Sequence, residues 1–138
     1  MSYAVEVSVS YDGSLEELKA DVEKALGVQL PHSESDENGS VRVFYGSLLT
    51  MDLELSINYL ETDRDLNFSD FQYILSTRTG AGYNFRQQLM DLQIPITHTM
   101  GLLLCYHLGA EVMVTVEAQE LYARYKPEEI KAKFGLSS

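Results

Sequence analysis

The sequence predicts an α+β fold, in which a single, mostly antiparallel sheet of about six strands packs against helices. Three observations predict it. Apolar and polar residues alternate strictly over residues 3–10 and 49–59, which is the spacing of strands. Residues 14–27 carry both the start and the stop signal of an amphipathic helix. An apolar run over 96–116 changes from helical spacing to strand spacing at Gly109, so a buried helix feeds a strand.

The first two elements follow from their residue pattern. Residues 3–10 predict a strand with one buried face, because Val5, Val7 and Val9 point one way and smaller or polar residues the other. Ser14 and Glu17 match a capping box, in which each side chain bonds the backbone N–H of the other residue. A helix over 15–26 with an apolar face is therefore expected, ending at the glycine in position 27.

The middle of the chain predicts an antiparallel meander. Residues 31–40 are polar, acidic and rich in turn formers, which indicates a mobile loop. Strands are expected over 41–45, over 49–59 and over 67–77, with Phe71 sharing a face with Tyr73 and Leu75; a turn is expected near Gly46 and an acidic turn over 61–65. The connections are too short for the crossovers that parallel strands require.

The C-terminal half predicts two helices, a hairpin and a last helix. Pro95 should end a first helix that runs from Asn84 to Gln93, because proline lacks the N–H that a helix interior uses. A second, buried helix over 100–108 would be capped by Thr97 or Thr99. Strands over 112–116 and 121–125 then form a hairpin, and a terminal helix opens at 126–129. The expected order is β-α-β-β-β-α-α-β-β-α in one domain of 138 residues.

Composition bounds the compartment. The chain has one cysteine, Cys105, which excludes an intramolecular disulfide and fits a reducing environment. The N-terminus lacks the basic and apolar regions of a signal peptide, and no apolar run approaches the ~20 residues that span a bilayer. A cytoplasmic location is the expectation.

The net charge of −11 lies entirely in the first half of the chain. Residues 1–70 hold 15 acidic and 4 basic residues, whereas residues 71–138 hold 6 of each. Nucleic-acid backbones and anionic membranes are disfavoured as partners, because both are bound through lysine and arginine. A basic protein is permitted, and long-range attraction would speed its capture.

Motifs for metal, cofactor or catalytic chemistry are not evident. The three histidines are far apart, and Cys105 lies in an apolar run without a cationic neighbour. The loop from Glu34 resembles the start of a calcium loop, but Tyr45 stands where a bidentate glutamate is needed. Gly80 and Gly82 lack the third glycine of a dinucleotide loop. No metal, no cofactor and no catalytic residue are therefore expected.

A non-catalytic acidic binding protein for a basic protein partner is the first functional expectation. Tyrosine is abundant and suits interfaces. The carboxylates expected to meet the partner lie on the strand over 49–59 and in the two acidic loops: Glu34, Asp36, Glu37, Asp52, Glu54, Glu61, Asp63 and Asp65.

In its size, acidity, α+β layout and lack of a catalytic motif, the chain resembles the small bacterial immunity proteins that neutralise a cognate toxin. The resemblance covers the overall character of the chain, carries no motif and transfers no residues. It implies a basic toxin as the partner.

Two alternatives belong to other classes. One is a small-ligand-binding or enzymatic domain, with a pocket between the sheet and the helices of residues 83–108. Its polar candidates are Tyr83, Asn84, Arg86, His98 and His107. The other is a homo-oligomeric structural protein, joined through the strand over 121–125 at an edge of the sheet.

Overall fold

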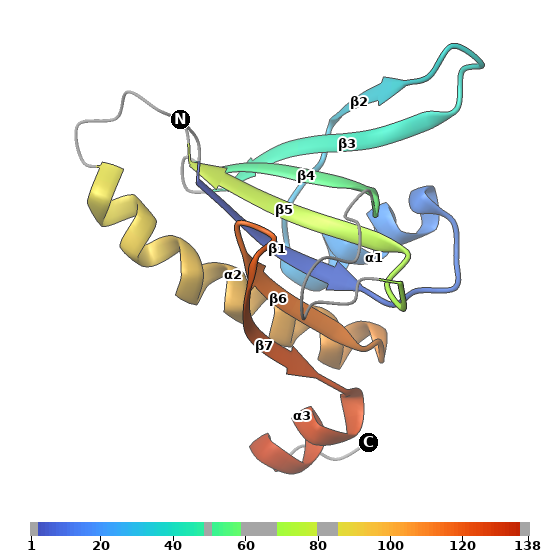
Figure 1. Ribbon diagram of the computed structural model, residues 1–138. Coiled ribbons are helices and arrows are strands. Elements are labelled where there is room, and N and C mark those ends of the chain that lie inside the picture. Colours follow the sequence, from blue (N-terminus) through green and yellow to red (C-terminus); the bar gives the residue numbers. More distant parts are fainter. Residues whose placement is uncertain (1–2, 49–50, 59–68, 80–85, 136–138) are drawn as a thin grey trace.

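The computed structural model describes residues 3–48, 51–58, 69–79 and 86–135, with side chains left out at residue 3 and residues 86–90. In these ranges the chain forms one antiparallel sheet and three helices, which confirms the α+β class (Figure 1). The strands are β1 (Tyr3–Val9), β2 (His32–Ser35), β3 (Val41–Leu48), β4 (Met51–Ile57), β5 (Tyr73–Thr79), β6 (Val112–Val116) and β7 (Glu120–Tyr125). The helices are α1 (Leu15–Leu26), α2 (Arg86–Leu108) and α3 (Pro127–Phe134).

The described strands lie in the order β2-β3-β4-β5-β1-β6-β7, so the N-terminal strand lies inside the sheet. β1 pairs with β5 on one side and with β6 on the other. β3, β4 and β5 are neighbours in chain order, which confirms the predicted meander. The expected strand over 67–77 begins outside the described residues, and residues 69–72 do not extend β5. Phe71 instead lies beneath Arg124 of β7, whose guanidinium carbon is 5.2 Å from the ring centroid.

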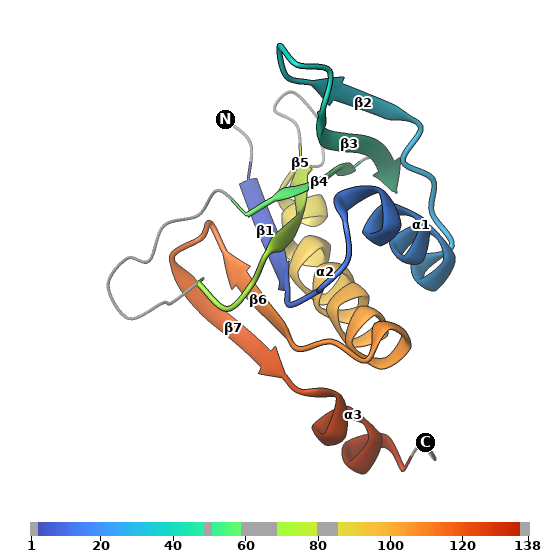
Figure 2. The ribbon, with the colours of Figure 1, turned by 90° about the vertical axis from the view of Figure 1, so that its right-hand side faces the viewer.

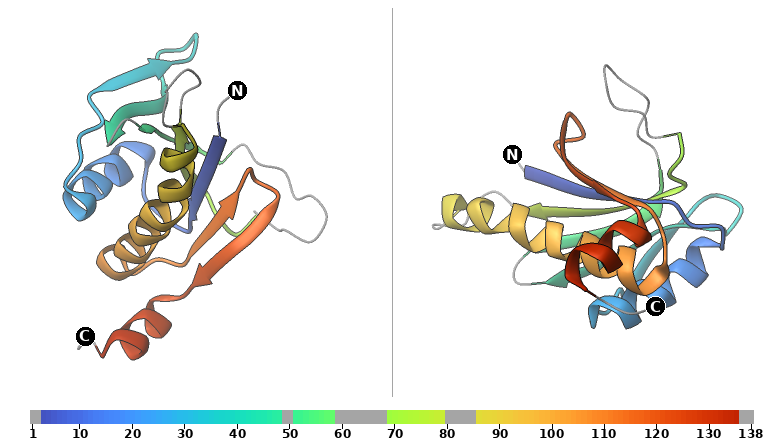
Figure 3. Two further views of the ribbon diagram at one scale, coloured as in Figure 1. Left: turned by 90° about the vertical axis from the view of Figure 1, so that its left-hand side faces the viewer. Right: turned by 90° about the horizontal axis from the view of Figure 1, so that it is seen from below.

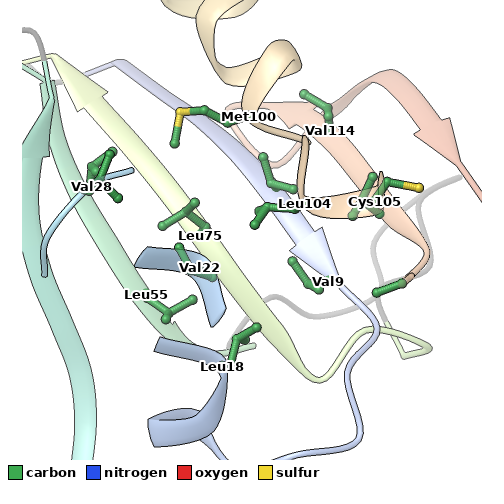
Figure 4. Packing of buried hydrophobic residues seen from close by; sticks show 14 of the residues in the cluster. Val9, Leu18, Val22, Val28, Leu55, Leu75, Met100, Leu104, Cys105 and Val114 are labelled. Atoms are coloured by element: carbon green, nitrogen blue, oxygen red, sulfur yellow. The ribbon is translucent and has the colours of Figure 1, made fainter. Parts of the chain in front are cut away.

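Two helices cover one face of the sheet. α1 and α2 lie side by side on that face (Figures 2 and 3), and α2 packs against β1, β5 and β6. Between the layers, side chains such as Leu18 of α1 and Leu104 of α2 meet Leu75 and Val114 of the sheet (Figure 4). α1 has the predicted capping box, and Gly27 ends it in the left-handed conformation at φ 68°.

The prediction of two helices around Pro95 is wrong, because α2 runs through it as one helix. Buried polar side chains on both sides of the proline anchor α2 to Thr77 of β5. Gln93 Nε2 donates to the Thr77 carbonyl oxygen at 3.0 Å, and the Thr97 and Thr77 hydroxyls are 2.9 Å apart. These contacts offset the roughly 3 kcal/mol that an interior proline costs. Thr97 and Thr99 are helix-interior residues rather than caps, and Thr99 Oγ1 donates to the Pro95 carbonyl.

The predicted loop over 31–40 is also partly wrong, because residues 32–35 form β2 at the edge of the sheet. All four residues of β2 are exposed, so its sequence shows no alternation of apolar and polar residues. The strand forms through backbone pairing with β3. The turn that follows is organised by Asp36, whose Oδ1 accepts from the N–H groups of Asn38 and Ser40. The β2–β3 hairpin extends beyond the rest of the sheet (Figure 1).

β3 continues past the expected end at residue 45, so Gly46 lies inside the strand, and the residues that join β3 to β4 lie outside the described residues. The segment that joins α1 to β2 passes so close that a Cβ at this position would lie 2.3 Å from the carbonyl oxygen of Gln29. Glycine is therefore required here by close approach rather than by a turn.

Candidate functional site

The sheet face opposite α1 and α2, called the open face below, carries a row of polar side chains. Each strand contributes one residue directly opposite the next, so neighbours in this row share the face. Taken from the β2 edge, the row is His32, Tyr45, Glu54, Ser76, Glu6 and Thr115.

Three carboxylates share the β2–β4 end of the open face with Tyr45, and two of them, Glu34 and Glu54, act on its hydroxyl. Glu34 comes from β2, whereas Asp52 and Glu54 come from alternate positions of β4. Burial, the hydrogen bond with Glu34, and the charges of Glu34 and Glu54 raise the pKa of the Tyr45 hydroxyl. The three strands therefore bring two carboxylates that are 20 residues apart in sequence to one phenol. Glu34, Tyr45, Asp52 and Glu54 are called the acidic face below.

A cavity of about 750 Å³ adjoins the acidic face where the segment from α1 crosses β3. Asp52, Glu54 and Tyr45 contribute polar groups to its lining, and Val28 and Leu53 contribute apolar walls. This combination suits a side chain with an aliphatic stem and a charged end.

Arginine compensates only part of the acidic face. Arg78 Nε lies 3.8 Å from Glu54 Oε2, and both side chains are about one-third exposed, so the pair is weak. Arg42 and Arg78 share a second cavity of about 530 Å³ with Glu54. The ion pairs within the described ranges include neither Glu34 nor Asp52.

The other predicted partner-binding residues have different surroundings. The Asp36 carboxylate accepts hydrogen bonds from backbone N–H groups of its own turn, and Glu37 is exposed in the same turn. Glu61, Asp63 and Asp65 lie outside the described residues. The predicted set thus contributes Glu34, Asp52 and Glu54 to one surface within the described chain.

The candidates for a ligand pocket are not brought together where the structure describes them. His98 and His107 are nine residues apart on α2, which places them on opposite sides of the helix. His98 Nε2 lies 2.8 Å from the Tyr125 hydroxyl, while His107 lines a cavity with Asp21 and Lys24. Burial and the charge of Lys133 lower the pKa of His98.

Of the remaining pocket candidates, the structure describes the backbone of Arg86 alone. Arg86 is the first residue of the helix, and its side chain is not described; Tyr83 and Asn84 lie outside the described residues.

Glu6 is a buried titratable residue that the sequence pattern did not indicate as a candidate. It is 2% exposed at the centre of the open face, and its Oε1 accepts from the Thr115 hydroxyl at 3.0 Å and from the Ala118 N–H at 2.7 Å. Burial and, to a smaller extent, the nearby Glu117 carboxylate raise its pKa to about 7 against the effect of those hydrogen bonds. No local signal separates Glu6 from a solvated glutamate, because its partners, Thr115 of β6 and Ala118 of the turn that follows, are more than 100 residues away in sequence.

Reactive groups are scarce in the part of the chain that the structure describes. Cys105 is fully buried, and burial raises the pKa of its thiol to about 11, which keeps it protonated and inert. Among the described side chains, histidine, cysteine and carboxylate groups do not gather in threes as a metal site would need. The described helices include none long and apolar enough to cross a bilayer.

Comparisons of the chain with protein-family models, with curated proteins and with solved structures found no match.

Proposed function

We propose that the protein is a non-catalytic binding module, which captures a basic protein through its acidic face. The observation that carries the proposal is the convergence of Glu34 and Glu54 on Tyr45 across three paired strands, with Asp52 beside Glu54 on the same face of β4. Paired strands are rigid, so the carboxylates are held in place before a partner arrives. Such preorganisation lowers the entropy that binding costs.

Charge favours a basic partner over an acidic or neutral one. The net charge of −11 attracts cationic proteins over a long range and speeds encounter. At contact, the cavity beside Asp52 and Glu54 accommodates a lysine or arginine side chain of the partner, with its stem against the half-buried Leu48 and its cation at the carboxylates. Tyr45 adds contact area with a polar tip, as tyrosines at interfaces commonly do.

The partner class we propose is a cationic toxin. The support is the resemblance in size, acidity and α+β layout to the small bacterial immunity proteins, together with an acidic face that is complementary to a basic protein. In this proposal the protein covers the basic surface of the toxin and does not alter it chemically.

The experiment compares two double variants in a pull-down from the source organism at low and high salt. In Glu34→Gln with Asp52→Asn, the acidic face loses two charges; the matched control, Glu16→Gln with Glu120→Gln, loses two exposed charges elsewhere. We expect the wild type to capture basic proteins, less of them at high salt, and the acidic-face variant to capture at least about threefold less.

The control variant should capture as much as the wild type. Recovery of acidic partners only, recovery of none, or equal losses in the two double variants would refute the proposal.

A further inference from the structure

The turn between β6 and β7 has a strained backbone. Its two central residues, Glu117 and Ala118, have φ values of 53° and 54°. The Gln119 N–H closes the turn by donating to the Val116 carbonyl oxygen at 3.0 Å. Hairpin turns with positive φ at both central positions favour asparagine and glycine, because most side chains disfavour that conformation. A strained backbone persists only where the surrounding structure holds it.

Hydrogen bonds to β1 hold both strained residues. The Glu117 N–H donates to the Ala4 carbonyl oxygen at 2.8 Å, and Glu117 Oε1 accepts from the Ala4 N–H at 3.1 Å. The Ala118 N–H donates to Glu6 Oε1 at 2.7 Å. A carboxyl group thus takes part in the contact at each strained residue. Ala4, Glu6, Glu117 and Ala118 are called the clasp below.

The two carboxyl groups of the clasp have different surroundings. Glu6 is almost completely buried, whereas Glu117 is exposed. Burial and, to a smaller extent, the charge of Glu117 raise the pKa of Glu6 to about 7, while its two hydrogen bonds and the charge of Arg78 on β5 oppose that rise. Its neighbours across the sheet, Ser76 of β5 and Thr115 of β6, carry no charge. The clasp therefore changes its charge in the neutral pH range.

The two ends of β7 are held differently. At the C-terminal end, Arg124 donates to Glu111 Oε2 from two nitrogens, at 2.6 and 3.0 Å. The Tyr125 hydroxyl lies 2.8 Å from His98 Nε2 of α2. The N-terminal end is exposed over residues 119–122 and directly follows the clasp. The C-terminal end of β7 is thus held independently of the clasp.

A register shift lies between these two ends. It falls between Val114 and Thr115, so β6 and β7 change their pairing in the middle of the hairpin. A shift of this kind interrupts the ladder of hydrogen bonds locally and bends the strand. The turn and the first residues of β7 can therefore move while the rest of the strand keeps its pairing with β6.

We propose that the clasp is a pH-sensitive switch, which holds the β6–β7 turn on β1 while Glu6 is protonated and releases the turn when Glu6 is ionised. In the closed turn, a neutral Glu6 accepts from the Ala118 N–H without a buried charge. An ionised Glu6 is a buried charge close to the Glu117 carboxylate, and both effects disfavour it. Release of the turn lets water reach Glu6, separates the two carboxylates and relaxes the backbone at Ala118.

Amide hydrogen exchange, followed at single residues from pH 6 to pH 8 and corrected for the intrinsic pH dependence of exchange, tests the proposal. In the wild type, the protection of the Ala118 N–H should fall about tenfold over this range. That is the change expected when Glu6 has a pKa of about 7 in the closed turn and its ordinary value of 4.5 in the open turn. The Gln119 N–H, which closes the turn, should follow it.

Three substitutions by glutamine separate the roles of the carboxyl groups. Glu6→Gln keeps an acceptor for the turn and should abolish the fall, because it has no proton to lose. Glu117→Gln removes only the neighbouring charge, so the fall should shrink but persist. This variant keeps Glu6 and tests the proposal if Glu6→Gln does not fold. Glu120→Gln is the matched control, since Glu120 is exposed just beyond the turn, and it should behave like the wild type.

Low concentrations of urea distinguish release of the turn from unfolding of the whole chain. Release exposes little surface, so the exchange rate of Ala118 should hardly respond to urea, whereas Val7 at the centre of the sheet should exchange faster as urea is added. The proposal would be overturned by protection at Ala118 that stays level from pH 6 to pH 8, or by a urea response at Ala118 as steep as that at Val7. A fall as large as that of the wild type in Glu6→Gln or Glu117→Gln, or a fall lost in Glu120→Gln, would overturn it as well.

Discussion

The side chains of β1 are buried on both faces of the sheet, but different interactions stabilise them on the two faces. On the helix-covered face, Val5, Val7 and Val9 are fully buried among leucines of α1 and α2. On the open face, Glu6 and Ser8 are 2% and 0% exposed, and a hydrogen-bond network surrounds Glu6. The same strand thus contributes to the fold through close packing on one side and through the hydrogen-bonded carboxyl of Glu6 on the other, where the Ser8 hydroxyl has no hydrogen-bond partner within the described residues.

The two faces should tolerate different kinds of substitution. Apolar packing is lost in proportion to the volume removed, whatever the pH. A buried carboxyl instead couples stability to protonation, because its charged form is disfavoured by burial. Changes on the helix-covered face should therefore depend on position, and changes at Glu6 should depend on pH.

The largest effect is expected from two adjacent leucines of α2. Leu104 is fully buried in the core, whereas Leu103 is 38% exposed. We expect Leu104→Ala to lower the free energy of unfolding by about 2–5 kcal/mol and Leu103→Ala to lower it by less than about 1 kcal/mol. Urea unfolding of dilute protein measures both, and similar losses at the two positions would show that the helix is oriented differently.

The next effect is the pH dependence that Glu6 confers. Its pKa in the folded protein is about 7, above its ordinary value of 4.5. Between pH 4.5 and pH 7, Glu6 therefore keeps a proton in the folded protein that it has released in the unfolded chain. The contribution of Glu6 to stability is therefore fully present below pH 4.5 and is lost as the pH rises through 7. The loss amounts to at most about 3 kcal/mol.

Glu6→Gln is the control for that dependence. Glutamine keeps an oxygen that can accept from the Ala118 N–H and the Thr115 hydroxyl, and it has no proton to release. Unfolding free energies measured between pH 5 and 8 should fall in the wild type and stay nearly level, by comparison, in Glu6→Gln. Parallel curves for the two proteins would mean that Glu6 is ionised at no cost in the folded protein.

The sequence predicted an element correctly where that element is determined by its own residues. The capping box of Ser14 and Glu17 and the left-handed Gly27 lie within one segment, and α1 has the predicted bounds. The predicted hairpin of β6 and β7 and the helix that begins at Pro127 are likewise confirmed. In each case the residues that decide the structure are neighbours in sequence.

Sequence reasoning failed where distant contacts decide. Pro95 ends a helix by local rules, but Thr77 of β5 holds Gln93 and Thr97 in helical positions on both sides of it. β2 has no apolar face and is a strand only because β3 pairs with it. Such pairing has no signature in a single segment.

The same distinction applies to the candidate site. The alternation over 49–59 predicted that Asp52 and Glu54 share a face, and the structure places them so. That Glu34 joins them across Tyr45 depends on β2, whose existence the pattern did not reveal. Arg78 beside Glu54 depends likewise on the β4–β5 register.

The smallest effect comes from the turn that Glu6 holds on the open face. Glu117 and Ala118 both have positive φ, at 53° and 54°, a conformation that costs a residue with a side chain roughly 1–2 kcal/mol. Ala118→Gly removes that cost at one position and keeps the backbone N–H that donates to Glu6. It should raise the free energy of unfolding by up to about 1 kcal/mol.

The same substitution in a regular helix should have the opposite sign. Ala20 is exposed in α1, where glycine lowers stability by about 1 kcal/mol relative to alanine. Thermal or urea unfolding of Ala118→Gly and Ala20→Gly therefore separates backbone strain from side-chain loss. If both variants were less stable than the wild type, the positive φ of Ala118 would carry no strain that glycine relieves, and the bonds from Glu6 would not be holding a strained turn.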